Sequence, residues 1–150
     1  METSQNGIDL IKHFEGCRLE PYLCSANVLT IGYGHTKDVV ENMSITEDTA
    51  EALLQQDLKE FEDHVSRLVE VHLNQNQFDA LVSWTFNLGA GNLGGSNLRS
   101  STMLKVLNQR KYDEVPEQMQ RWNKSAGVVN KGLVKRRGAE ALLFASKAWT

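Results

Sequence analysis

Apolar residues recur three and four positions apart through most of this chain, and one segment near its start breaks the pattern. This spacing places apolar side chains on one face of a helix and therefore predicts helices. The predicted helices span about 4–16, 46–70, 75–89, 101–109, 113–122 and 133–148. Residues 17–36 instead combine Pro21, a β-branched run and turn residues, which indicates a small hairpin or three short strands.

Polar residues and glycines indicate where these helices begin and end. Residues 89–97 hold four glycines and are expected to form a loop, and Gly127 and Gly132 should break the chain before the last helix. A cap residue accepts hydrogen bonds from free backbone N–H groups in a first helical turn. The expected caps are Ser44 (with Glu47 in a capping box), Asn74 (with Gln77), Ser100 or Ser101, and Asp113.

The order of these elements predicts an α+β fold with two lobes. The short strands cluster near one end of the chain, and the helix over 46–70 is long enough to join a small β lobe to a larger helical lobe. At 150 residues the chain is expected to be a single domain with a substantial core. We expect an N-lobe over about 13–60, and a C-lobe over about 70–150 that also includes the N-terminal helix.

Composition narrows the class of protein. Apolar content of 41% and charged content of 23% are typical of a soluble globular chain. No apolar run approaches the roughly 18 residues of a membrane span, and no signal peptide is visible, so a cytoplasmic start is expected. With only Cys17 and Cys24, a disulfide scaffold is not expected. The net charge of −3 provides no broad attraction to nucleic acid.

One stretch departs from this acidic balance. Residues 121–137 carry six basic side chains and no acidic one. The stretch is consistent with local binding of an anionic ligand and equally with a solvated helix face and the loop before it.

Three residues around the predicted hairpin are candidates for catalysis. Glu15 ends the first helix, and a carboxylic acid in an apolar cleft can keep a proton near neutrality and donate it. Thr30 is either a β-forming residue on a pleated face or a hydroxyl that holds water. Cys24 is either a small half-buried side chain or a reactive thiol. Each residue alone is also compatible with a structural role.

Other polar residues suggest contacts between segments. His13, Cys17, Cys24 and His35 are of the types that form tetrahedral zinc sites, although the compact C-x₂-C spacing is missing. His35 is either an exposed histidine of the turn or a partner of Asp57, and such a pair would attach the hairpin to the long helix. The remaining candidates for ligand or acid contacts are Asn87, Arg136 and Arg137.

Taken together, the segments resemble the phage-type lysozymes, or endolysins, of glycoside hydrolase family 24. The matching strings occur in family order over nearly the whole chain: FEGCRLEPY, TIGYGHT, ITEDTAEALLQQDL, QFDALVSWTFNLGAG, STMLKVLN and GLVKRRGAE. The family's catalytic signature is Glu, eight residues, Asp or Cys, five residues, then Thr. Glu15, Cys24 and Thr30 match that spacing.

The resemblance implies a lysozyme-like fold and a muramidase that cleaves the β-1,4 bond between N-acetylmuramic acid and N-acetylglucosamine, with inversion and without a cofactor. It implies that Glu15 is the general acid, that Cys24 stands at the second catalytic position, and that Thr30 helps to orient water. It further implies that Arg137, and less so Arg136, lies near the acid. The implied substrate-binding residues are Gly32, Tyr33, Gly34, His35, Asn87 and Arg137.

The resemblance also implies a setting. The protein would act as a monomer on peptidoglycan, without nucleic acid or stable membrane association, and would wait in the host cytoplasm for a holin-type release. Three alternatives stay open: a wall-binding protein of this fold with little catalysis, a zinc-stabilised interaction domain, and an enzyme controlled by a disulfide between Cys17 and Cys24.

Overall fold

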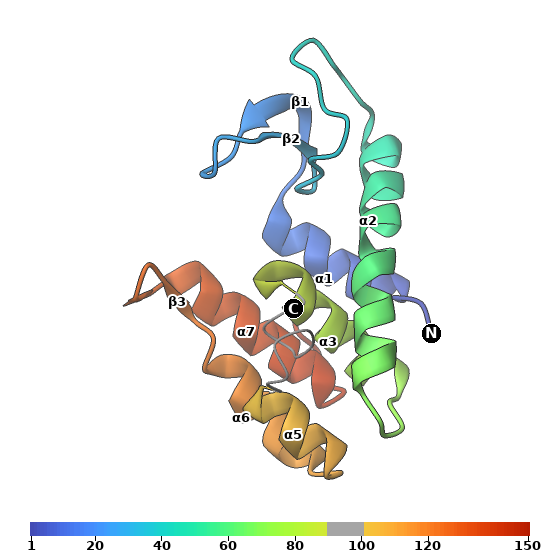
Figure 1. Ribbon diagram of the computed structural model, residues 1–150, viewed down its shortest axis with the longest axis vertical. Coiled ribbons are helices and arrows are strands. Elements are labelled where there is room, and N and C mark those ends of the chain that lie inside the picture. Colours follow the sequence, from blue (N-terminus) through green and yellow to red (C-terminus); the bar gives the residue numbers. More distant parts are fainter. Residues whose placement is uncertain (90–100) are drawn as a thin grey trace.

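The computed structural model describes residues 1–89 and 101–150 and has the two-lobed α+β architecture predicted from the sequence. A small β lobe lies at one end, helices fill the other, and the long helix α2 extends along both (Figure 1). The elements are α1 Gln5–Glu15, β1 Arg18–Leu23, β2 Leu29–Gly32, α2 Glu47–Leu68, α3 Gln75–Leu88, α5 Thr102–Asn108, the 3₁₀ turn η1 Tyr112–Glu114, α6 Val115–Gln120, β3 Lys124–Ser125, β4 Val128–Val129 and α7 Lys131–Phe144.

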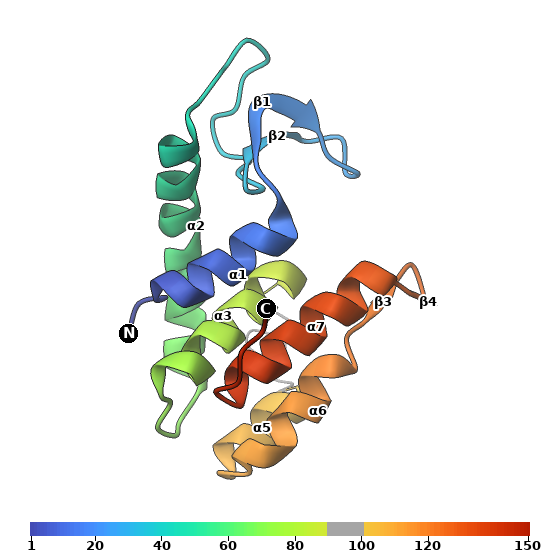
Figure 2. The same cartoon turned by 180° about the vertical axis from the view of Figure 1, so that it is seen from behind.

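The β lobe is built on an antiparallel pair, β1 and β2. Arg18 pairs with Gly32 and Tyr22 pairs with Thr30, so β1 contains a bulge between these pairs. Pro21 lies in that bulge, where its missing N–H interrupts no ladder bond. Figures 1 and 2 show the hairpin directly beyond the C-terminal end of α1, so this short connection places the β lobe next to the end of that helix.

The cap of α2 differs from the prediction. The Thr46 side chain accepts a hydrogen bond from the backbone N–H of Thr49, which makes Thr46 the N-cap, whereas Ser44 is exposed and lies outside the helix. The predicted capping box of Ser44 with Glu47 is therefore wrong. The apolar stripe is confirmed, because Leu54, Leu58 and Val65 are buried on one face.

Helix α3 forms the centre of the helical lobe, and α1, α2 and α7 pack around it (Figure 2). Its capping box is as predicted, since Asn74 accepts from the Gln77 N–H and the Gln77 side chain accepts from the Asn74 N–H. Eight consecutive residues from 78 to 85 are buried, so the helix is enclosed on every side. The Trp84 indole N–H meets the carbonyl of Met119 on α6.

The C-terminal third corrects several boundaries. Ser101 caps α5, and the predicted loop over 89–97 lies outside the described residues apart from Gly89, which ends α3. A hairpin of β3 and β4 was not predicted. Helix α7 begins after Asn130 and includes Gly132 in its first turn, so Gly132 does not break the chain. Among the described residues, no helix is both long enough and apolar enough to cross a membrane.

Candidate active site

Glu15 lies at the point where α1 ends. Gly16 adopts a φ of +72°, a left-handed conformation that favours glycine and turns the chain toward β1. The carboxylate is 21% exposed, and its Oε2 accepts a hydrogen bond from Arg136 Nη1 at 2.6 Å. Its Oε1 lies beside the hairpin turn, 3.6 Å from where a Cβ on Gly34 would stand. One carboxylate oxygen is thus held by the helical lobe and the other faces the β lobe.

The arginine that contacts the acid is Arg136. Arg136 bonds Glu15 directly, whereas Arg137, the other arginine expected near the acid, is fully buried and bonds Glu140, Asn87 and the carbonyl of Trp122. Burial lowers the pKa of Arg137, and Glu140 opposes that shift. A side chain enclosed in this way cannot reach a bound sugar, so Arg137 supports the site from behind.

Asn87 lies near the end of α3 and is exposed, but its Oδ1 accepts a hydrogen bond from Arg137. Asn87 is therefore bonded to Arg137 of α7 through the carbonyl oxygen of its side-chain amide.

Sequence reasoning missed Glu140 and Ser83, which complete the cluster behind Glu15. Glu140 is fully buried and bonds both arginines, and Ser83 Oγ donates to Glu140 Oε2 at 2.5 Å. A charge at position 140 within an apolar stretch, four residues after an arginine, was a usable signal.

Cys24 and Thr30 meet in the β1–β2 hairpin. Hydrogen bonding from the backbone at Val28 and Ala26 lowers the pKa of the Cys24 thiol, with a further contribution from the Thr30 hydroxyl. Thr30 is 3% exposed and donates its hydroxyl proton to the Val28 carbonyl at 2.9 Å. The Thr30 hydroxyl proton is already donated to the Val28 carbonyl. The backbone at Val28 and Ala26 is therefore the main cause of the lowered pKa of Cys24.

The turn Gly32–His35 closes the β lobe over α2. Ile31 and His35 exchange two backbone hydrogen bonds, and His35 Nδ1 lies 2.8 Å from Asp57 Oδ2 on α2, so the predicted pair is confirmed. Gly34 has a φ of +88°, which side-chain-bearing residues rarely adopt. A cavity of about 450 Å³ lies between this turn and α2, lined in part by Gly34, His35 and Asp57.

Tyr33, in the same turn, is buried in the core at 7% exposure. Burial and the neighbouring Cys17 raise the pKa of its hydroxyl. The side chain of Tyr33 therefore contributes mainly to packing.

The geometry of the described residues does not support the zinc site or the disulfide between Cys17 and Cys24. His13 packs on Phe14, and both ring nitrogens of His35 have oxygen partners. The described residues contain no group of three or more His, Cys, Asp or Glu side chains arranged to hold a metal ion. The strand Arg18–Leu23 separates Cys17 from Cys24, and at about 3.3 Å per residue this exceeds the Cα separation of about 7 Å that a disulfide tolerates.

The basic stretch 121–137 divides into two parts. Arg136 and Arg137 are buried in the cluster around Glu140, whereas Lys124, Lys131 and Lys135 are exposed along the β3–β4 hairpin and the start of α7. The solvated-face interpretation fits these lysines, and neither interpretation anticipated the buried arginines.

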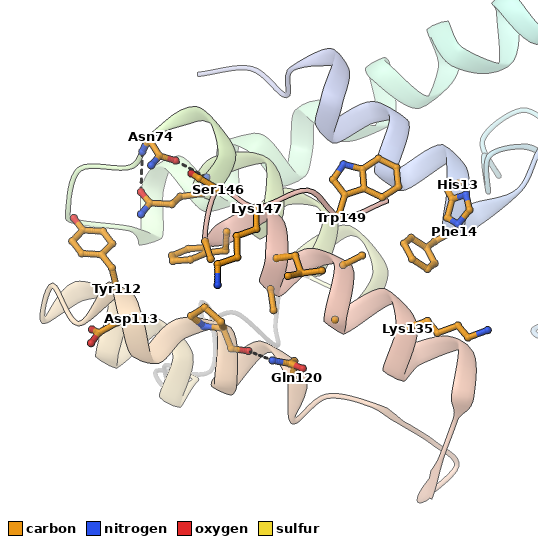
Figure 3. A pocket seen from close by; sticks show the side chains of 18 residues that line it. His13, Phe14, Asn74, Tyr112, Asp113, Gln120, Lys135, Ser146, Lys147 and Trp149 are labelled. Atoms are coloured by element: carbon orange, nitrogen blue, oxygen red, sulfur yellow. Dashed lines mark hydrogen bonds between the residues drawn. The ribbon is translucent and has the colours of Figure 1, made fainter.

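Another cavity, of about 1040 Å³, lies elsewhere on the helical lobe. It follows α7 from Lys135 to Phe144 and continues to Lys147 in the tail, with Trp149 and His13 at one side and Tyr112 at the other (Figure 3). None of the predicted site residues lines it. Asp113 is the acid in its wall, so this cavity has no pair of groups suited to the predicted chemistry.

Comparison with known proteins identifies the family to which the chain belongs. The sequence profile of the phage lysozyme family matches residues 12–140. The chain belongs to the phage lysozyme family. A crystal structure of a P22 lysozyme variant has a TM-score of 0.87 and 39% identity, and the match covers 97% of this chain and 99% of that one. The muramidase domain of SpmX from Asticaccaulis excentricus has a TM-score of 0.86 and 37% identity, over 95% and 97% of the two chains.

Curated family members differ in length. The endolysin of Bacillus phage B103 is 46% identical over 96% of this chain, yet the chain spans only 54% of that protein. The endolysin of Salmonella phage P22 is 41% identical, and there the match covers 97% of this chain and 99% of the relative. The similarity thus spans almost all of this chain and about half of the longer relatives.

Proposed function

We propose that this chain hydrolyses peptidoglycan at the β-1,4 bond between N-acetylmuramic acid and N-acetylglucosamine, and thereby lyses bacteria. The observation that carries the proposal is the placement of Glu15: Oε2 is held by Arg136, while Oε1 faces the hairpin turn at Gly34. Membership of the phage lysozyme family and the muramidase among the structural neighbours support the reaction type.

In the proposed mechanism Glu15 carries a proton on the oxygen that faces the β lobe and donates it to the leaving glycosidic oxygen. The bond from the anomeric carbon to that oxygen breaks, and a water oxygen bonds the anomeric carbon from the opposite face. The water proton passes to the thiolate of Cys24, which then releases it to solvent, and solvent returns a proton to Glu15. This single displacement inverts the anomeric configuration and needs no cofactor.

Cys24 and Thr30 take the roles of water activation and water orientation in this scheme. A neutral thiol is a poor base, so the lowered pKa of Cys24 favours the role because it increases the thiolate fraction at a given pH. A Thr30 hydroxyl oxygen that has donated its own proton to Val28 can still accept a hydrogen bond from water.

The substrate would lie between the β lobe and the helical lobe, which we propose to be the two halves of a single catalytic domain. Gly32, Tyr33, Gly34 and His35 would border the glycan on one side, with the exposed Asn87 amide on the other. A monomer would suffice, because every proposed group comes from one chain. We propose that the protein reaches the wall after holin-type release from the host cytoplasm, in keeping with relatives named endolysin.

The test is loss of turbidity in outer-membrane-permeabilised Gram-negative cells, together with release of reducing ends from purified peptidoglycan. Glu15→Gln keeps the shape of the side chain and removes its proton donation, so we expect lysis to fall by at least about a hundredfold. Glu117→Gln is a matched control, because that carboxylate forms an exposed ion pair with Arg121 on α6. Equal lysis by Glu15→Gln and the wild type would remove Glu15 from this role.

A second pair of variants examines Cys24. Cys24→Asp replaces the thiol by a carboxylate and should retain activity with a changed pH profile, whereas Cys24→Ser has no ionisable group near neutrality and should lose most activity. Full activity in Cys24→Ser would contradict a base role. Retained wall binding without any release of reducing ends by the wild type would point to the wall-binding alternative.

A further inference from the structure

Glu140 is a fully buried carboxylate on α7, where its chain neighbours Ala139 and Ala141 are also buried. Removing a carboxylate from water is costly unless cations and hydrogen-bond donors compensate it. A position of this kind on a helix that packs against the centre of the lobe would ordinarily be apolar. The charge at this position therefore needs a physical explanation.

Three donors from two helices meet this carboxylate. Oε1 accepts a hydrogen bond from Arg137 Nη1. Oε2 accepts from Arg136 Nε at 3.2 Å and from the Ser83 hydroxyl at 2.5 Å. Both oxygens are thus occupied, and Ser83 ties the group to α3. Such a network holds its members in one geometry, because each bond is made away from competing water.

This network also fixes the orientation of the Arg136 guanidinium. Its Nε is held by Glu140 and its Nη2 by the Ser83 carbonyl at 3.3 Å. A guanidinium is planar and rigid, so fixing two of its nitrogens fixes the third. The third nitrogen, Nη1, is the one that donates to Glu15 Oε2 at 2.6 Å. The direction of that bond is set from inside the helical lobe.

We propose that Glu140 is a positioning residue for the acid: it holds Arg136 so that Arg136 binds Oε2 of Glu15 and leaves Oε1 free to face the β lobe. This inference rests on the proposed role of Glu15. Glu140 also balances the charge of the cluster, in which two arginines alternate with two glutamates. Without the Glu140 charge, the cluster around Arg136 and Arg137 would be more positive.

The charges of the groups around Glu15 determine how the rate of the enzyme should depend on pH. Helix α7 contributes Arg136 and Arg137, α3 contributes the uncharged hydroxyl and carbonyl of Ser83, and the hairpin turn faces Glu15 with the uncharged Gly34. Arg137 is tied in turn to the neutral amide of Asn87. Among these groups, Glu140 therefore carries the negative charge that a substitution can remove.

The experiment is the pH–rate profile of Glu140→Gln on purified peptidoglycan, with kcat and KM measured separately. The amide retains the shape but removes the charge. We expect kcat to fall about tenfold because the acid is misplaced, and KM to stay within about twofold. We also expect the alkaline limb of the profile to move to lower pH, because removing the Glu140 charge makes the cluster more positive and so favours loss of a proton there. A merely structural role would lower the amount of active protein without moving that limb.

Two further variants keep the test decisive. Ser83→Ala removes one donor to Glu140 and should move the alkaline limb in the same direction by a smaller amount, and it decides the question if Glu140→Gln does not fold. The exposed Glu117→Gln should match the wild type in every parameter. Folded Glu140→Gln and Ser83→Ala proteins with the kcat and alkaline limb of the wild type would overturn the proposal. Lysis that does not depend on Glu15 at all would overturn the proposed function instead.

Discussion

Asp79 on α3 accepts hydrogen bonds from both the backbone N–H and the hydroxyl of Ser4, the residue that precedes α1. Asp79 is fully buried, so these bonds are shielded from water. Ser4 makes no side-chain cap within its own helix, and Asp79 takes over that task from a neighbouring helix. The carboxylate also lies favourably at the positive end of the helix dipole. This contact fixes α1, and hence the position of Glu15, against the centre of the helical lobe.

Gly7 allows this close approach. A Cβ at position 7 would lie 2.7 Å from Cβ and Cγ of Asp79, so Gly7→Ala should destabilise the protein by about 1–3 kcal/mol. Gly138, inside α7, has open space where a Cβ would stand, so Gly138→Ala should stabilise it by about 0.5–1 kcal/mol. Urea unfolding of the two variants measures both effects. A stabilising Gly7→Ala would show that α1 does not need this contact.

The pair of His35 and Asp57 should stabilise the junction between the hairpin and α2. The His35 ring is mostly buried, and the two groups lie 2.8 Å apart, so their interaction should contribute about 1–3 kcal/mol near neutral pH. A double-mutant cycle of His35→Asn and Asp57→Asn isolates that interaction from the rest of each substitution. Additive effects of the two substitutions on the free energy of unfolding would refute a direct coupling.

The N-cap of α2 offers a test of two neighbouring hydroxyls. Thr46→Ala removes the acceptor for the Thr49 N–H and should cost about 1 kcal/mol. Ser44→Ala changes an exposed side chain outside the helix and should leave the free energy of unfolding within about 0.5 kcal/mol. Thermal unfolding of both proteins makes the comparison. If Ser44→Ala were the more damaging change, the assignment of the cap to Thr46 would fail.

Cys24 should form its thiolate at lower pH than an unrestrained thiol. Hydrogen bonding from the backbone at Val28 and Ala26 stabilises the charged form, which lowers the pKa, so alkylation by iodoacetamide should reach its half-maximal rate at lower pH in the folded protein than in urea. A Cys17→Ala background leaves Cys24 as the single thiol of the chain. Equal midpoints in the folded and unfolded protein would contradict this prediction.

Local pattern predicted most of the helices and the first hairpin, and the misses share a cause. Ser44 and Thr46 are both suitable caps by sequence, and only the backbone path shows which one precedes the first turn. Helix α7 was expected to reach about residue 148, but it ends at Phe144 because Ser146 adopts a φ of +58°. The tail then crosses to α1, where the Trp149 indole N–H donates to Asn6.

The candidate site likewise has some residues that the sequence alone indicates and others whose roles depend on helix packing. The spacing of Glu15, Cys24 and Thr30 is a property of a short segment, and a family signature in such a segment can be read directly. The choice between Arg136 and Arg137 depends on which face of α7 meets α1, a matter of helix packing across 121 residues of chain. The role of Glu140 likewise depends on α3 and α7 lying side by side, and no local pattern encodes that contact.

The sequence by itself determined the helix periodicity, the small hairpin and the family signature, because each depends on local propensity or on residues within a short, recognisable motif. Only the tertiary structure decided which arginine holds Glu15, that Arg137 is buried, that Cys17 and Cys24 are too far apart to bond, and that Glu140 anchors the cluster. Those outcomes depend on the relative placement of α1, α3, α7 and the hairpin. That placement follows from burying many apolar side chains at once. Because the hydrophobic effect is not directional, no single segment shows how these elements pack together.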